Sequence, residues 1–250
     1  MRNAEHWQPT KFVCTKHGLR GSRSAKHVSP SSRHITDLIA QCYERAIRTH
    51  AAGRLLDLGC GHVPLYETYR DLVTENICVD WENTLHQNGF IDLYVDLNRT
   101  LPFEDASFDT ILLTDVLEHI PGPGRLICEI ARLLRPSGKF ILGVPFFYWL
   151  HEEPHDYYRY TEYALRRFCQ LNRLHILELH PYGGLPDILV DLISKGIEGL
   201  PSSLVVCVRP VNLFASMLSG TSLFIKFSES TRSTFPLGYV CVAEKQSSEP

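Results

Sequence analysis

The sequence predicts an α/β fold in which a mostly parallel sheet carries helices on both faces. Short apolar runs of strand length alternate with segments whose apolar residues recur at helical spacing. Several of these runs end in an acidic residue or a glycine, as strands often do where the chain turns into the next helix. Strands that are separated by helices need right-handed crossovers, so we expect them to pair in parallel.

The chain begins with a basic segment that has no periodic apolar pattern. Residues 1–30 are polar, and Gly18 and Gly21 interrupt them, so we expect a flexible arm rather than a packed element. Two interpretations of its Lys and Arg residues stay open: a solvated tail, or a lid that folds over a bound ligand and excludes water. We place the globular domain at residues 31–250.

The elements of this domain follow from their apolar spacing. A helix is expected from Ile35 to about His50, behind a Ser-Ser start signal. Five strands and a helix that stops at Pro136 come next. The strands are expected at residues 54–58, 77–80, 93–97, 108–114 and 139–144.

The last third of the chain is less regular. A loop rich in His and Tyr follows Phe146 and leads to a helix at about 161–171. Two more strands are expected at 175–180 and 238–243. Residues 183–235 between them contain apolar helical segments and are too long for a bare loop, so we expect a mostly helical insertion.

Composition limits the class of protein. The chain has 250 residues, of which 44% are hydrophobic, and a net charge of only −3. That charge argues against a protein that coats nucleic acid. Residues 1–50 hold nine Lys and Arg against three Asp and Glu, so the acidic excess lies in the rest of the chain and mildly favours a cationic ligand.

Cysteine usage and hydropathy predict a cytoplasmic location. The eight cysteines are scattered without a C-x-x-C pair and are expected to be free thiols. No apolar segment follows Met1 as in a signal peptide. The most apolar window, residues 204–227, contains Arg209 and Pro210, which makes it a poor membrane span.

The strongest local motif is LLDLGCG at residues 55–61, an apolar strand that ends in an acid and turns through two glycines. Glycine allows the tight turn and lets a ligand lie against the backbone. Dinucleotide-binding enzymes share such a turn, but Pro64 leaves the G-x-G-x-x-G phosphate fingerprint incomplete. Asp57 would repel a pyrophosphate and attract a positive charge.

Together with four later segments, this motif resembles the class I S-adenosylmethionine-dependent methyltransferases, and among them the methyltransferase type 11 group. The later segments are ICVD at 77–80, VDLNRTLPFEDASFDTIL at 95–112, DVLEHI at 115–120 and RLLRPSGKFIL at 132–142. The resemblance implies a Rossmann-like sheet of seven strands whose last strand is antiparallel. It also implies S-adenosylmethionine as the cofactor. His62-Val63-Pro64 departs from the pattern, since many relatives carry another glycine there.

The resemblance also assigns the residues that would bind the cofactor, all of them at the carboxyl ends of strands. Asp57 lies where the methionine end binds, Asp80 where the ribose hydroxyls bind, and Asp96 with the following backbone amide where the adenine binds. Thr114 and Asp115 face the sulfonium and the methyl acceptor. The full set is Asp57, Gly59, Cys60, Gly61, Asp80, Trp81, Asp96, Leu97, Thr114 and Asp115.

The loop HEEPHDYYRYT at 151–161 is the candidate for acceptor recognition, because it follows the fifth strand and is dense in polar and aromatic side chains. The candidate substrate-binding residues are Asp156, Tyr157, Tyr158 and Arg159. The candidate general bases are His155, then His119 and His151. A surface loop whose tyrosines pack on the next helix is the alternative, and a helix-start histidine is the alternative for His119.

The letters H-E-x-x-H at 151–155 spell the zinc-protease signature, but Pro154 would break the helix that this signature needs. No metal site is therefore expected. The function predicted is methyl transfer to an oxygen, nitrogen or carbon of a small-molecule or glycan-like acceptor. Three alternatives stay open: a non-catalytic S-adenosylmethionine-binding subunit, a membrane-surface enzyme with residues 204–227 as an amphipathic foot, and a nicotinamide-dependent reductase.

Overall fold

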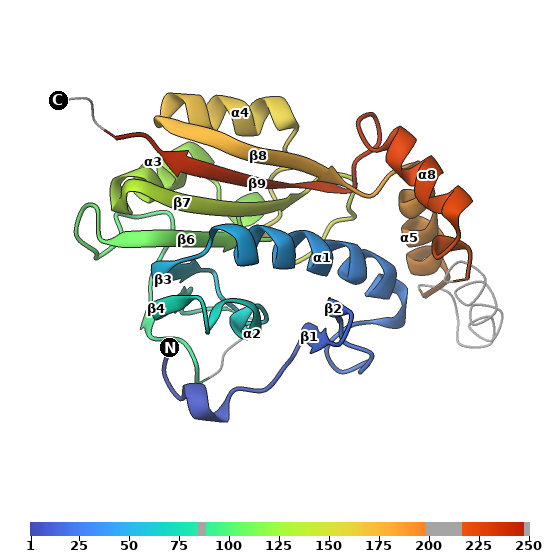
Figure 1. The fold of residues 1–250 in the computed structure, drawn as a ribbon, viewed down its shortest axis with the longest axis horizontal. Helices are drawn as coiled ribbons and strands as arrows, with labels where there is room; N and C mark the ends of the chain where they lie inside the picture. The colour runs from blue at the N-terminus through green and yellow to red at the C-terminus, as the bar shows by residue number, and fades with distance from the viewer. Residues whose placement is uncertain (85–88, 199–216, 248–250) are drawn as a thin grey trace.

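A seven-stranded sheet forms the centre of the molecule (Figure 1). The computed structural model describes residues 1–84, 89–198 and 217–247. The strand order is β5-β4-β3-β6-β7-β9-β8; neighbours from β5 to β7 are parallel, and β9 is antiparallel to both β7 and β8. The predicted fold class, including the antiparallel last strand, is confirmed. The strands are β3 (Gly53–Leu58), β4 (Val73–Asp80), β5 (Leu93–Tyr94), β6 (Phe108–Thr114), β7 (Leu134–Pro145), β8 (Leu174–Tyr182) and β9 (Gly238–Lys245).

Helices cover both faces of this sheet, because its strands are apolar on both sides. On β6, Ile111 and Leu113 face a core that includes α3 (Pro123–Leu133) and α4 (Glu162–Leu171). Leu112 between them faces the opposite core, which includes α1 (Arg33–His50). The shorter helical elements are η1 (Ala4–His6), η2 (Pro30–Ser32), α2 (Tyr66–Tyr69) and η3 (Leu117–His119).

The third predicted strand is shorter than expected. β5 ends at Tyr94, whereas the apolar run suggested a strand to Leu97. The Asp96 carboxylate accepts hydrogen bonds from the Asn98 backbone and side-chain amides, at 2.9 and 3.0 Å. This side-chain turn competes with extended backbone and ends the strand.

The amino-terminal segment is packed, which contradicts the expectation of an unpacked arm. β1 (Phe12–Thr15) and β2 (Gly18–Gly21) form an antiparallel hairpin that lies beside α1 (Figure 1). Phe12 and Leu19 are 2% and 1% exposed in the α1-side core. The Glu44 side chain of α1 accepts from the Leu19 backbone N–H at 2.7 Å. An isolated two-stranded hairpin is at best marginally stable, so packing against α1 stabilises this one.

The described part of the predicted insertion is helical. α5 (Leu185–Glu198) and α8 (Ser222–Thr231) contact each other before β9 begins. Residues 204–216 of the predicted amphipathic foot lie outside the described residues. Across the described ranges, no helix has the length and hydropathy that a bilayer crossing requires. The boundaries of 31–250 for the domain and 183–235 for the insertion stay predictions.

Candidate functional site

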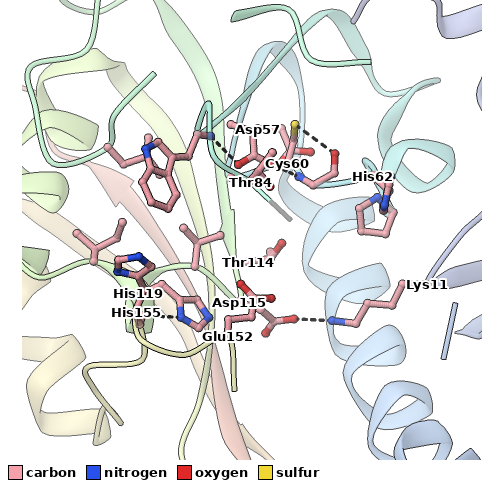
Figure 2. A pocket seen from close by; sticks show the side chains of 18 of the residues that line it. Lys11, Asp57, Cys60, His62, Thr84, Thr114, Asp115, His119, Glu152 and His155 are labelled. Carbon is pink, nitrogen blue, oxygen red and sulfur yellow. Dashed lines mark hydrogen bonds and ion pairs between the residues drawn. The ribbon is translucent and has the colours of Figure 1, made fainter. Parts of the chain in front are cut away.

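A cavity of about 1030 Å³ opens at the carboxyl ends of β3, β4 and β6 (Figure 2). This is the edge of the sheet at which open α/β folds bind ligands. The volume reaches the upper end of the range of small-molecule pockets, so a cofactor and an acceptor can lie in it together. The predicted cofactor residues that line it are Asp57, Gly59, Cys60, Gly61, Asp80, Trp81, Asp96, Leu97, Thr114 and Asp115.

The turn after β3 forms the floor of this cavity. Gly59 has a φ of 68°, and a Cβ built on it would lie 2.6 Å from the Val116 side chain, so any other residue would strain the turn. The backbone N–H groups of Gly59 and Cys60 both donate to the Val79 carbonyl, at 2.9 and 3.0 Å. The turn is thereby tied to β4, and its backbone is open to a ligand.

Asp57 is the most deeply buried acid of the turn, with 4% of its surface exposed. Its carboxylate accepts a hydrogen bond from the Tyr69 hydroxyl at 3.2 Å. Burial raises the pKa of Asp57 from 3.8 to about 7, and the nearby Asp80 charge adds to the rise. A carboxyl group in this state is stabilised in its ionised form by a ligand with positive charge.

The two acids that follow along the edge differ in exposure. The Asp80 carboxylate is buried and accepts from the backbone N–H groups of Gly61 and Trp81, at 2.8 and 2.6 Å. The Asp96 carboxylate is half-exposed, and hydrogen bonds from Asn98, together with the charge of Arg99, lower its pKa. Both therefore offer oriented oxygens as acceptors, as the resemblance implies for a nucleoside.

Asp115, beyond the end of β6, has a different environment from the other acids. It adopts a φ of 56°, which is uncommon for a residue with a side chain. The Tyr43 hydroxyl donates to one carboxylate oxygen at 2.8 Å, and the Lys11 ammonium donates to the other at 2.9 Å. Burial lowers the pKa of Lys11, but the charge and hydrogen bond of Asp115 raise it overall. Asp115 is thus held in a fixed position as an ion pair.

Lys11 and Tyr43 were not among the candidate site residues, although the lid interpretation of the basic segment includes Lys11. Lys11 belongs to the segment expected to be an unpacked arm, and Tyr43 lies on a helix far from any motif. Figure 2 shows Lys11 reaching Asp115 from the side opposite His119 and His155. No local pattern marks either residue, because only the packing of the hairpin and α1 brings them to the cavity.

The loop after β7 brings some of its predicted residues to the cavity. His155 and Tyr157 line it, and His155 Nδ1 lies 3.1 Å from the Tyr157 hydroxyl. The His155 ring also meets the exposed Trp81 indole edge to face, with centroids 5.3 Å apart. His119 lines the cavity next to them, and its Nδ1 lies 2.9 Å from the His155 carbonyl oxygen.

Asp156, Tyr158 and Arg159 do not line this cavity. The Arg159 guanidinium donates to both Asp156 oxygens, at 2.5 and 2.7 Å, and this contact lowers the Asp156 pKa. Arg159 also donates to the Trp149 carbonyl at 2.8 Å, and the Tyr158 hydroxyl donates to the Pro121 carbonyl at 3.0 Å. These contacts hold the loop in shape, a role the sequence did not suggest.

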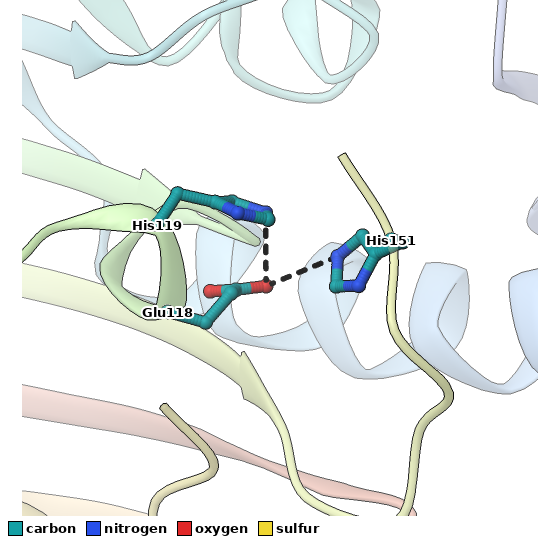
Figure 3. Close-up of side chains that lie close together, drawn as sticks. All are labelled: Glu118, His119 and His151. Carbon is teal, nitrogen blue, oxygen red and sulfur yellow. Dashed lines mark ion pairs between the residues drawn. The ribbon is translucent and has the colours of Figure 1, made fainter. Parts of the chain in front are cut away.

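His151, the third predicted base, lies with His119 around Glu118 (Figure 3). Each histidine Nε2 lies 3.8 Å from Glu118 Oε1. The Glu118 side chain is fully buried, and burial raises its pKa well above the ordinary value. Glu118 was not among the candidate residues, although it precedes His119 directly; a carboxylate with two imidazoles is a set that could hold a metal ion.

Comparison with known families agrees with the resemblance. Residues 56–142 match the family model described as a methyltransferase domain. The matched range runs from β3 to β7 and contains the glycine turn and the acids of β4 and β6. The predicted family is confirmed for this part of the chain, and with it the prediction of S-adenosylmethionine as the cofactor.

Two curated relatives show how far the similarity extends. The chain is 35% identical over 120 residues to a ubiquinone biosynthesis O-methyltransferase of Xanthomonas oryzae pv. oryzae, covering 44% of this chain and 50% of the relative. It is 29% identical over 140 residues to the 27-O-demethylrifamycin SV methyltransferase of Amycolatopsis mediterranei, covering 51% and 49%. The chain thus spans about half the length of the curated relatives it matches.

Solved structures share the fold over more of the chain. A SAM dependent methyltransferase from Archaeoglobus fulgidus superposes with a TM-score of 0.53 at 16% identity, covering 82% of this chain and 90% of that protein. At this identity the likeness establishes the fold and nothing about the acceptor.

Proposed function

We propose that this protein is an S-adenosylmethionine-dependent methyltransferase that acts on a small-molecule or glycan-like acceptor, because residues 56–142 match the methyltransferase family model. One observation carries the proposal. A single cavity is lined by the acids and glycines of the cofactor motif and also by Asp115, His119 and His155. This one cavity has room for a cofactor and an acceptor side by side.

The residues present fit the cofactor. Gly59 and Gly61 line the cavity without side chains that would fill it, and Asp57, Asp80 and Asp96 line the same cavity. Asp57 favours a cation, and Asp80 and Asp96 can accept hydrogen bonds from hydroxyl and amino groups. S-adenosylmethionine supplies a methyl group on a positively charged sulfur and leaves as S-adenosylhomocysteine.

We infer that the acceptor lies between Asp115 and the loop after β7. The aromatic rings of Trp81 and Tyr157 and the charged pair of Lys11 and Asp115 line that part of the cavity. A polar ring system or sugar would satisfy both kinds of contact. Two relatives carry O-methylation in their names, which favours an oxygen over a nitrogen or carbon acceptor.

The chain then has two tasks, alignment and removal of a proton. Alignment of two bound molecules alone lowers the barrier of a bimolecular step substantially. As the acceptor oxygen bonds to the methyl carbon and the carbon–sulfur bond breaks, the hydroxyl proton passes to His155. His155 is exposed to the cavity and lies within hydrogen-bond distance of the Tyr157 hydroxyl, which can orient its ring.

The test is formation of S-adenosylhomocysteine when the full chain is incubated with S-adenosylmethionine and a library of hydroxylated small molecules and glycans. Product with at least one acceptor supports the proposal. If S-adenosylhomocysteine binds tightly but no acceptor is methylated, the non-catalytic subunit is favoured instead. Tight binding of NADH without binding of S-adenosylhomocysteine would favour the reductase.

With an acceptor in hand, His155→Gln tests the base. We expect turnover to fall by about 10²- to 10⁴-fold while the S-adenosylhomocysteine Kd stays unchanged. The matched control is His175→Gln, because His175 is an exposed histidine on β8 outside the cavity. Unchanged turnover in His155→Gln would reject His155 as the base.

A further inference from the structure

We propose that Glu118, His119 and His151 bind one divalent transition-metal ion beside the acceptor end of the cavity, through Glu118 Oε1 and the two histidine Nε2 atoms. No metal is expected from the sequence, because H-E-x-x-H at 151–155 contains Pro154 and cannot form a regular helix. The three residues come together differently, from η3 and from the loop after β7 (Figure 3).

The first observation is the state of Glu118. Its side chain has no exposed surface, and neither carboxylate oxygen finds a hydrogen-bond partner among the residues that the structure describes. A buried polar group without a partner is costly, and native proteins nearly always satisfy such groups. A cation held between this carboxylate and the two imidazoles would satisfy it.

The second observation is the orientation of the two imidazoles. His119 Nδ1 lies 2.9 Å from the His155 carbonyl oxygen. His151 Nδ1 lies 3.3 Å from the Trp149 carbonyl oxygen and 3.4 Å from Asp156 Oδ2. A proton on each Nδ1 would be donated to these acceptors, and each Nε2 would then offer a lone pair to a cation beside Glu118. Metal-binding histidines are oriented by such contacts.

The spacing fits a metal ion. Each Nε2 lies 3.8 Å from Glu118 Oε1, and the three ligand atoms lie within 4.8 Å of one another. Two ligands at zinc bond lengths and the tetrahedral angle are roughly 3.4 Å apart. The two Nε2–Oε1 distances are only a few tenths of an ångström longer, and the limit of 4.8 Å means that the two imidazoles must also move toward each other to close the site.

A second His–Glu–His cluster in the same molecule contains a carboxylate whose oxygens have charged and hydrogen-bonding partners. Glu178 lies between His50 and His180, at 2.9 and 3.1 Å, and also pairs with Arg45. The arginine neutralises that carboxylate, and hydrogen bonds use its oxygens. Glu178 therefore needs no cation and provides a matched control for Glu118.

The ligand set indicates the kind of metal and its role. Two imidazoles and one carboxylate suit Zn²⁺, Fe²⁺ or Mn²⁺ and leave coordination positions open. His119 is both a ligand and a lining residue of the cavity, so an open position can face the acceptor. In that role, which rests on the proposed function, the ion would hold the acceptor hydroxyl and ease loss of its proton to His155.

The experiment uses the untagged full chain after dialysis against a chelator. Zn²⁺ is titrated in competition with a chromophoric chelator, and bound metal is counted by elemental analysis. We expect one Zn²⁺ per chain, with affinity weakened about 100-fold or more in Glu118→Gln and His151→Gln and unchanged in Glu178→Gln. Asp156→Asn, which removes the carboxylate beside His151 Nδ1 and also weakens the pair with Arg159, should weaken binding by about 10- to 100-fold.

Two results would overturn the metal site: Zn²⁺ binding no stronger in the wild-type chain than in Glu118→Gln, or equal loss in Glu118→Gln and Glu178→Gln. If Glu118→Gln does not fold, as judged by circular dichroism, His151→Gln decides. Calorimetry with S-adenosylhomocysteine on the same samples separates the two proposals. A chain that binds S-adenosylhomocysteine but no Zn²⁺ rejects only the metal site.

Discussion

Replacing Asp57 by Asn should stabilise the ligand-free protein at pH 8 and weaken its binding of the cofactor. The folded state raises the pKa of Asp57 from 3.8 to about 7, so it holds a proton that the unfolded chain has already released in this range. The free energy of unfolding therefore falls as pH rises from 3.8 to 7. Above pH 7 the full cost of the buried charge is present.

The magnitude follows from the two pKa values. At about 1.4 kcal/mol per pH unit, the cost of the ionised carboxylate is about 4 kcal/mol at pH 8 and less than half of that at pH 5. Asn keeps the size of the side chain and an oxygen that can accept from Tyr69, but carries no charge. With about 2–4 °C of Tm per kcal/mol in a chain of this size, the full cost corresponds to a gain of roughly 8–16 °C at pH 8.

The assay is thermal unfolding of both proteins at pH 5 and pH 8, with S-adenosylhomocysteine affinity measured by calorimetry at pH 8. Asp109→Asn is the control. Burial raises the pKa of Asp109, but hydrogen bonds from Arg54 and Arg135 hold it below its ordinary value, so its loss should lower Tm at pH 8. A Tm of Asp57→Asn equal to or below wild type at pH 8 would refute the reasoning, as would a gain that is the same at both pH values.

Three further variants test other parts of the account. Gly59→Ala places a methyl group against Val116 at a φ of 68°, so the turn that lines the cavity must shift. S-adenosylhomocysteine binding should weaken at least tenfold in a calorimetric titration; unchanged affinity would contradict a role of this turn in cofactor binding. Phe12→Ala should lower the unfolding free energy by about 3–5 kcal/mol in a urea titration, whereas an unpacked arm would show almost no change. Arg159→Gln should lower turnover with S-adenosylhomocysteine affinity kept, since it loosens only the loop; a loss confined to cofactor affinity would argue against that role.

The cofactor half of the site was predictable because its signals are local. Asp57, Gly59 and Asp80 each stand at the end of an apolar run, and the topology of a parallel sheet places such ends at one edge. The antiparallel last strand came from the resemblance, since periodicity alone does not fix the direction of a strand. The observed pairing agrees with the resemblance: neighbours from β5 to β7 are parallel, and β9 is antiparallel to β7 and β8.

The acceptor half was less predictable because tertiary contacts build it. Lys11 reaches Asp115 only because the hairpin of β1 and β2 packs on α1, and a four-residue strand gives no periodic signal. The density of polar and aromatic residues marked the loop at 151–161 as a candidate part of the site. Composition does not tell which of its side chains line the cavity, as Tyr157 does, and which pair within the loop, as Arg159 does with Asp156. Glu118 was overlooked because its burial becomes visible only in three dimensions.

Calorimetric titration of the full chain with S-adenosylhomocysteine, alongside Asp80→Ala, tests the cofactor site most directly. Asp80 is buried at the cavity and oriented by two backbone N–H groups. We expect one binding site per wild-type chain and affinity at least tenfold weaker in the variant. Absence of binding to the folded wild-type chain, or equal affinity in both proteins, would contradict the account.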